Sequence, residues 1–161
     1  MLLFSFNTYA NIKFENLHTS DGKSFTQKEM NSDVRIASFF FSSCAHTCLL
    51  INAKLKSIYE KIQKNENIKI ISVTVDPKYD TIKVLRKYAG KWRKDPNKWK
   101  FITGDAKNIF SVIKNEFKLP GGGMAFVHSE SVIVYRNGKN VGTYSLFDDK
   151  ELKKLYESLG I

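Results

Sequence analysis

The chain contains two cysteines, and their spacing is the feature most able to do chemistry. Cys44 and Cys48 stand four residues apart, where an apolar run gives way to a helical pattern. On a helix, residues at i and i+4 lie one above the other, with Cβ atoms roughly 5–6 Å apart. Two thiols at that separation can share one metal ion, or close to a disulfide after a modest backbone adjustment. We therefore expect them to act together, the alternative being two small core residues.

Few other side chains could complete a metal site with the cysteines. His128 follows a glycine-rich segment and precedes a strand pattern, and glycines let a chain carry a side chain toward a site. Its alternative role is a partly buried histidine bonded to the backbone. His46 would point about 200° away from Cys44 on a helix, and thus into solvent. His18 follows the first strand pattern as a surface residue, and Met124 is either an axial thioether or a gap-filling loop residue.

The donor types favour one metal over another. Two thiolates and one imidazole form a soft set of three donors. Cu(I) accepts trigonal coordination by such a set, and Cu(II) can be held there with a further weak ligand. Structural zinc requires four closed ligands, whereas this chain offers three obvious ones. We therefore expect copper, as Cu(I) or Cu(II).

The charge is strongly basic but does not indicate a nucleic-acid reader. The 161 residues carry a formal net charge of +10, and lysine supplies 22 of the 26 basic residues. Nucleic-acid readers rely on arginine forks combined with aromatic platforms. The densest basic run, over residues 87–100, is typical of a solvated helix surface. A docking surface for an acidic protein partner remains a second interpretation.

The N-terminus leaves two interpretations open. Residues 1–11 are expected to be an arm or the remnant of a signal or anchor, and residues 12–161 a single domain. The first ten residues are apolar and end in Thr-Tyr-Ala, but they lack the positively charged leader of a signal peptide. No run reaches the 18 apolar residues of a membrane span. Membrane association is therefore expected only through a segment not evident in this sequence.

Hydrophobic periodicity predicts an α/β fold. An N-terminal β-hairpin is followed by alternating strands and helices, then by a second hairpin around Asn137-Gly138 and a last helix. The expected elements are hairpins over 12–27 and 131–146, strands over 35–42, 68–75 and 99–102, and helices over 49–62, 81–92, 106–117 and 148–159. The segment 119–123 is expected to be a loop. This order predicts a thioredoxin-like fold, a mixed central sheet with helices on both faces. Cys44 and Cys48 would lie just beyond the carboxyl end of a parallel strand, where chemistry gathers in such sheets.

Several motifs in this order resemble those of one protein family. They are Cys44-x-x-x-Cys48, Val75-Asp76-Pro77-x-x-Asp80-Thr81 and His128-Ser129, with Asp21-Gly22-Lys23 and Ile102-Thr103-Gly104 in support. The pattern resembles the Sco/SenC family of copper proteins over residues 12–147. The family commonly has proline after each cysteine, where this chain has Ala45 and Leu49.

The resemblance implies a site, a function and a location. It implies a thioredoxin-like domain that binds one copper ion through Cys44, Cys48 and His128. Asp76 and Asp80 would orient the site, or simply end a strand and cap a helix. Such proteins help to build the binuclear copper centre of cytochrome c oxidase as metallochaperone, as thiol–disulfide reductant, or as both. Implied partners are subunit II of the oxidase and other copper chaperones or thiol reductants, and the implied location is exported, periplasmic or membrane-anchored facing the periplasm.

Two enzymatic alternatives remain open. In a thiol–disulfide oxidoreductase, Cys44 would be the attacking thiolate because the positive helix end lowers its pKa. The spacing differs, however, from the Cys-x-x-Cys of thioredoxins. In a peroxidase of the peroxiredoxin type, a Pro-x-x-x-Thr-x-x-Cys pattern is expected, whereas Ser42 and Ser43 precede Cys44 here. We expect negligible peroxide consumption.

Overall fold

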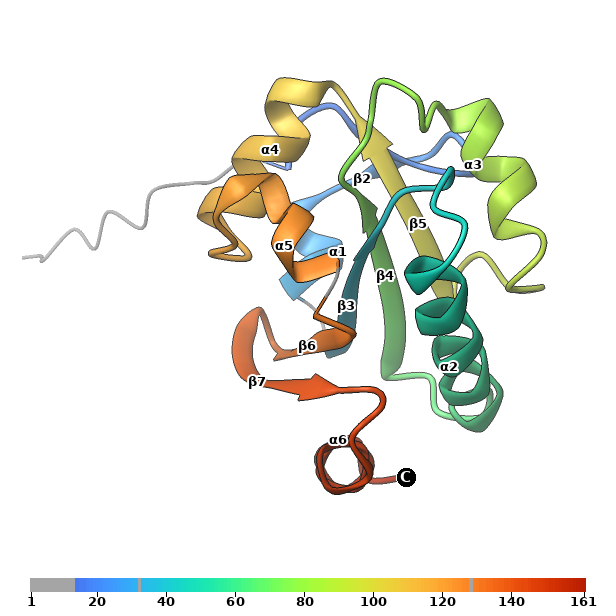
Figure 1. The fold of residues 1–161 in the computed structure, drawn as a ribbon, viewed down its shortest axis with the longest axis vertical. Coiled ribbons are helices and arrows are strands. Elements are labelled where there is room, and N and C mark those ends of the chain that lie inside the picture. The colour runs from blue at the N-terminus through green and yellow to red at the C-terminus, as the bar shows by residue number, and fades with distance from the viewer. Residues whose placement is uncertain (1–13, 32, 128) are drawn as a thin grey trace, which may run out of the picture.

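The structure is a computed structural model that describes residues 14–31, 33–127 and 129–161. Within these residues the strands form a seven-stranded sheet in the order β2-β1-β5-β4-β3-β6-β7 (Figure 1). The strands are β1 (Leu17–Thr19), β2 (Ser24–Phe25), β3 (Val34–Phe40), β4 (Ile68–Thr74), β5 (Trp99–Gly104), β6 (Ser131–Arg136) and β7 (Lys139–Ser145).

Three parallel strands form the middle of the sheet. β3 pairs with β4 from Val34↔Ile68 to Phe40↔Thr74, and β4 pairs with β5 in the same direction. Every residue of β3 is buried, as expected for a strand covered on both faces. The outer strands β1, β2, β6 and β7 are antiparallel to their neighbours, which makes the sheet mixed. The carboxyl ends of β3 and β4 therefore meet at one edge.

Helices cover both faces of the sheet, which confirms the expected thioredoxin-like architecture. Side chains alternate between faces along a strand, so Phe39 and Phe40 point in opposite directions. Phe40 stacks on Tyr88 of α3 (Ile82–Ala89) with ring centroids 5.3 Å apart. Phe39 meets Phe117 edge-on at 4.9 Å, just after α4 (Ala106–Asn115), and Phe126 of α5 (Met124–Val127) at 5.4 Å.

The remaining helices join these two layers. α2 (Thr47–Lys61) lies beside α3, and Asn52 Nδ2 in α2 donates a hydrogen bond to the Tyr88 hydroxyl in α3 at 2.7 Å. α6 (Asp149–Leu159) adjoins α2, where Lys61 lies over the Tyr156 ring at 5.4 Å. On the opposite face, the Glu29 carbonyl in α1 (Gln27–Asn31) accepts a bond from Arg35 Nε at 2.7 Å. α2, α3 and α6 thus form one layer, and α1, α4 and α5 the other.

Local signals set several element ends as predicted. The Asp105 carboxylate caps α4 by accepting from the backbone of Lys107 at 2.9 Å, and Asp148 caps α6 by accepting from Glu151 at 2.9 Å. Asn137 and Gly138 both have positive φ, 50° and 75°, as the two-residue turn between β6 and β7 requires.

Other expectations require correction. The first strand begins at Leu17 rather than at residue 12, with a turn at residues 15–16, so His18 lies within β1 and is half-buried. The helix expected from residue 49 begins at Thr47 and so includes Cys48, and α3 ends at Ala89 rather than at residue 92. Part of the segment expected to be a loop, Gly121–Gly123, is the 3-10 turn η1, and it leads directly into α5. No helix in the described residues is long and apolar enough to cross a membrane.

Candidate metal and redox site

The two cysteines lie together at the carboxyl end of β3. Cys44 is in the loop between β3 and α2, and Cys48 is in the first turn of α2, so the pair is not stacked on one helix as the spacing predicts. The backbone N–H of Cys48 donates to Cys44 Sγ at 3.4 Å. Both cysteines are free thiols; Cys44 is half-buried and Cys48 is fully buried. The structure therefore keeps the expected juxtaposition, but a loop and a helix start supply it.

The two thiols differ sharply in acidity. Burial opposes ionisation of Cys44, but the backbone groups of Cys48, His46 and Thr47, together with the Cys48 thiol, hold the pKa of Cys44 below its ordinary value. Burial raises the pKa of Cys48 to about 12, and the adjacent Cys44 adds to this effect. Cys44 is therefore the more acidic and more accessible thiol, as the start of a helix favours.

Asp80 fixes the loop that carries Cys44. Its carboxylate is fully buried and accepts the backbone N–H of Ser42 at 3.1 and 3.3 Å. The hydroxyls of Ser42 and Thr74 also donate to it. Thr74 ends β4, so this single carboxylate ties the end of β4 to the chain two residues before Cys44. Burial is the main cause that raises the pKa of Asp80, while the three donors oppose it.

Asp76 has a different place. It is half-buried, and its backbone N–H donates to Thr74 Oγ1 at 2.9 Å. Its carbonyl accepts from the N–H groups of Tyr79 at 3.2 Å and Asp80 at 2.9 Å. Its charge also contributes to the raised pKa of Asp80. Asp76 thus shapes the turn that delivers Asp80, and Asp80 makes the side-chain contacts.

The other candidate metal donors lie in different parts of the structure. His46 is exposed, as predicted, and Met124 has an exposed fraction of 43%. His18 lies in β1, opposite Ser24 and Thr103, rather than beside the cysteines. His128 lies outside the described residues. Among the residues that are described, no group of three or more His, Cys, Asp and Glu side chains is placed to hold a metal.

The segment that precedes residue 128 runs along the edge of the sheet that carries the cysteines. Gly121, Gly122 and Gly123 all have positive φ, between 62° and 83°. A Cβ on Gly123 would lie 3.3 Å from Val75 Cγ1, and the N–H of Val75 donates to the Phe40 carbonyl at 2.8 Å. Gly123 therefore packs against the carboxyl ends of β3 and β4, where a side chain would not fit without a shift.

Three neighbours of the cysteines were not among the expected site residues. Ser42 holds Asp80, and Asn52 lies one helical turn after Cys48. Asn52 is buried and donates to the buried Tyr88 hydroxyl. Burial and the neighbouring Cys48 raise the pKa of Tyr88, which keeps this phenol neutral. The position of Asn52 at i+4 from Cys48 was the available clue, because such residues share a helix face.

Fold and site together define a thioredoxin-like domain with an adjacent pair of free thiols at the carboxyl edge of its sheet. Comparison with known proteins makes the class more specific. The SCO1/SenC family model matches residues 6–156, so the chain belongs to the SCO1/SenC family. A SCO1 protein homolog of Bacillus subtilis is 28% identical over 132 residues, which cover 78% of this chain and 68% of that protein.

Solved structures share the fold. A SCO1/SenC family lipoprotein of Bacillus anthracis superposes with a TM-score of 0.74 at 22% identity, covering 90% of both chains. Yeast Sco1 with copper bound gives 0.71 at 22% identity, covering 90% of this chain and 89% of that one. BsSco, a member of the Sco family of cytochrome c oxidase assembly proteins in which a disulfide switch was identified, gives 0.71 at 23% identity over 90% and 88%.

Proposed function

We propose that this protein binds a single copper ion as cargo and supplies it to the binuclear copper site in subunit II of cytochrome c oxidase. The observation that carries the proposal is the adjacent pair of free thiols, Cys44 and Cys48, at the edge of a thioredoxin-like sheet. Family membership supports it, since relatives include a copper-bound Sco1 and a member of a family of cytochrome c oxidase assembly proteins.

The thiols fit copper chemically. Copper in its Cu(I) state is a soft cation that thiolates prefer, and three donors satisfy it. Cys44 is poised to ionise, whereas the buried Cys48 gives up its proton more readily when a cation shares the site. Copper binding by the thiol pair therefore releases protons, and the affinity for copper falls as the pH falls. An open edge, with Cys44 half-buried, suits transfer of the ion to another protein.

We assign His128 as the third ligand and Asp80 as the residue that positions the cysteine loop. The support for His128 is the packing of Gly123 against Val75, which brings the preceding segment along the same edge of the sheet. The support for Asp80 is its set of bonds to Ser42 and Thr74. Asp76 helps by shaping the turn before Asp80.

The test is an anaerobic titration of reduced protein with Cu(I) in competition with a chromogenic chelator, with the metal quantified by elemental analysis. We expect one copper per chain, lost or weakened at least tenfold in Cys44→Ser, Cys48→Ser and His128→Ala. The matched control is His46→Ala, which removes an exposed imidazole next to the pair. Unchanged affinity in either serine variant would refute the copper proposal, and unchanged affinity in His128→Ala would remove His128 from the site.

A second function, reduction of a disulfide in the copper-accepting protein, is favoured by the split acidity of the thiols. The Cys44 thiolate attacks one sulfur of the target disulfide, and the other sulfur leaves as a thiolate and takes up a proton. Cys48 then loses its proton and attacks Cys44 Sγ, which releases the second target thiol. Two electrons and two protons pass to the target while the pair becomes a disulfide. Trapping a mixed disulfide with the Cys48→Ser variant, and none with Cys44→Ser, would establish this role with Cys44 as the attacking thiol; no mixed disulfide with either variant would exclude it.

We further propose that the protein acts outside the cytoplasm, as an exported or membrane-anchored domain facing the periplasm. The support is the fold shared with a SCO1/SenC family lipoprotein. Fractionation of cells expressing the native gene tests it: we expect the protein in the membrane or periplasmic fraction, and recovery in the cytoplasm alone would contradict it.

A further inference from the structure

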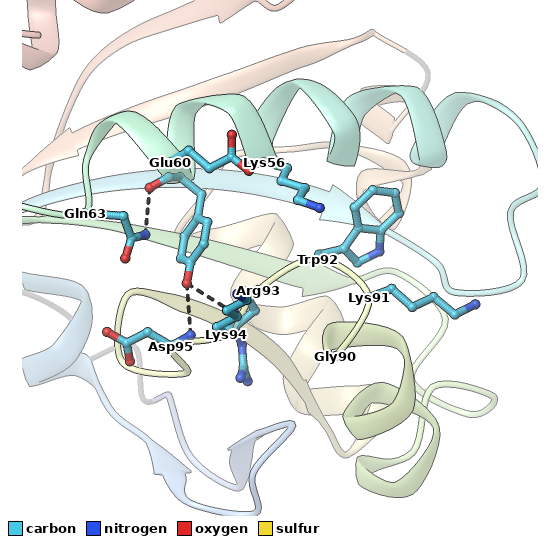
Figure 2. Close-up of a pocket in the computed structure, with 10 residues that line it drawn as sticks. Lys56, Glu60, Gln63, Gly90, Lys91, Trp92, Arg93, Lys94 and Asp95 are labelled. Atoms are coloured by element: carbon cyan, nitrogen blue, oxygen red, sulfur yellow. Dashed lines mark hydrogen bonds between the residues drawn. The ribbon is translucent and has the colours of Figure 1, made fainter.

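A trough on the α2–α3 face begins at the cysteine loop. One cavity of about 530 Å³ is lined by Ser42, two residues before Cys44, and by residues of α3. A second, of about 620 Å³, lies between α2 and residues 90–95, where Figure 2 shows Lys56 and Trp92 on neighbouring walls. Lys91 lines both cavities, so the two adjoin. The trough thus runs from Ser42 in the cysteine loop along α3 toward the far end of α2.

The charged side chains that line the trough near the cysteine loop are all positive. The charged residues that line the first cavity are Lys83, Lys87 and Lys91, and no described carboxylate lines it. All three lysines are exposed, and none forms an ion pair with another described residue. Carboxylates line only the second cavity, which also carries further lysines. The part nearest Cys44 is therefore an unneutralised cationic row.

The spacing of this row suits an extended chain. Lys83 and Lys87 are four residues apart on α3, a separation of about 6 Å along a helix axis, and Lys91 follows four residues later. In an extended segment, alternate side chains on one face are about 6.6 Å apart. Carboxylates at every second position of an extended segment would therefore match Lys83 and Lys87, and Lys91 lies in the turn that follows α3.

Apolar side chains beside the thiols indicate a protein occupant. Leu49 and Leu50 directly follow Cys48, with exposed fractions of 41% and 55%. Tyr79, which lines the first cavity, is 55% exposed. Large apolar side chains rimmed by charge mark protein contact surfaces. A nucleic acid would favour arginine forks and stacked aromatic platforms, whereas lysine supplies all the charge lining the cavity next to the cysteine loop.

We propose that this trough binds an extended acidic segment of a partner protein, with carboxylates at alternate positions facing Lys83, Lys87 and Lys91. The inference rests on the proposed function, since docking there holds the partner within reach of the cysteine pair. The three lysines attract the acidic segment and set its position along the trough, while the exposed ring of Tyr79 supplies an apolar contact.

The probe is the peptide acetyl-Glu-Ser-Glu-Ser-Glu, titrated at low ionic strength into copper-free, reduced, ¹⁵N-labelled protein. We expect amide shift changes over residues 79–94, and about a tenfold loss of affinity in Lys83→Gln/Lys87→Gln/Lys91→Gln, as the loss of three exposed ion pairs implies. The matched control is Lys107→Gln/Lys114→Gln/Lys139→Gln, which removes the same charge from exposed lysines away from the trough. It should stay within about twofold of the native protein.

Three outcomes would overturn the proposal: equal losses in both triple variants, shifts confined to another face, or equal binding of acetyl-Gln-Ser-Gln-Ser-Gln. Tighter binding of a single-stranded oligonucleotide of equal charge would assign the trough to nucleic acid instead. Copper stoichiometry separates this inference from the proposed function. The trough variant should still bind one copper, and loss of copper there would contradict a pure docking role. A native protein that binds the peptide but no copper would refute the copper function alone.

Discussion

Replacement of Asp80 by alanine should destabilise the protein and loosen the cysteine loop. The change leaves the Ser42 N–H and the Thr74 hydroxyl without their acceptor, and Thr74 is fully buried. Each buried group left unsatisfied costs about 1–3 kcal/mol, so we expect a loss of about 3 kcal/mol in the free energy of unfolding. For a chain of this size that lowers Tm by about 6–12 °C. The assay is thermal unfolding of the reduced, copper-free protein by circular dichroism.

The matched control is Asp76→Ala. Asp76 makes its described hydrogen bonds through its backbone, which alanine retains, so this change should cost less than about 1 kcal/mol. A Tm for Asp80→Ala within 2 °C of the native value, or an equal fall in Asp76→Ala, would refute the role given to this carboxylate.

The Asp80→Asn variant tests the raised pKa of Asp80. Stability from Asp80 is full below its ordinary pKa of 3.8 and is lost as the pH rises through the higher folded value. The stability deficit of Asp80→Asn should therefore shrink from acid to neutral pH, and a growing deficit would contradict the raised pKa.

Three further predictions concern the thiols, the helix pair and one glycine. Iodoacetamide at neutral pH should alkylate Cys44 well before Cys48, because Cys44 has the lowered pKa and the greater exposure; peptide mass mapping measures this, and faster labelling of Cys48 would contradict it. Tyr88→Phe leaves the buried Asn52 amide without its acceptor, at a cost of about 1–3 kcal/mol in urea unfolding; an unchanged midpoint would show that the bond contributes nothing. Gly104→Ala would place a Cβ 2.5 Å from a backbone carbonyl oxygen at the β1–β5 edge, so Tm should fall; a stabilised variant would show that this edge adapts freely.

The long elements could be predicted because their signals are local. The largely apolar run of β3 and the helical periodicity of α4 and α6 each specify one structure, and aspartate caps fix where those two helices begin. The turn at Asn137-Gly138 likewise depends on two adjacent residues.

The short elements could not be predicted because tertiary contacts form them. α1 is five residues long and is held by the bond from Arg35 to the Glu29 carbonyl, while α5 is four residues long and packs through Phe126 on Phe39. Isolated helices of such length are unstable, so their own sequence carries little signal. His18 was misplaced for a related reason, since β1 is fixed by pairing with β5, far along the chain.

The site likewise combines features that local sequence predicts with features that only tertiary contacts form. The spacing of Cys44 and Cys48 indicated a joint role, and the structure brings them together, although by a loop rather than by one helix. The hydrogen bond between Asp80 and Ser42 joins segments that are 38 residues apart. No local sequence pattern predicts such a contact. His128 remains a prediction, because it lies outside the described residues.

X-ray absorption spectroscopy at the copper edge of the Cu(I)-loaded protein shows which atoms bind the metal. We expect two sulfur neighbours and one nitrogen neighbour around a single copper, with one sulfur signal lost in Cys44→Ser and in Cys48→Ser alike. Coordination by nitrogen and oxygen alone, or a spectrum that neither serine variant changes, would contradict it.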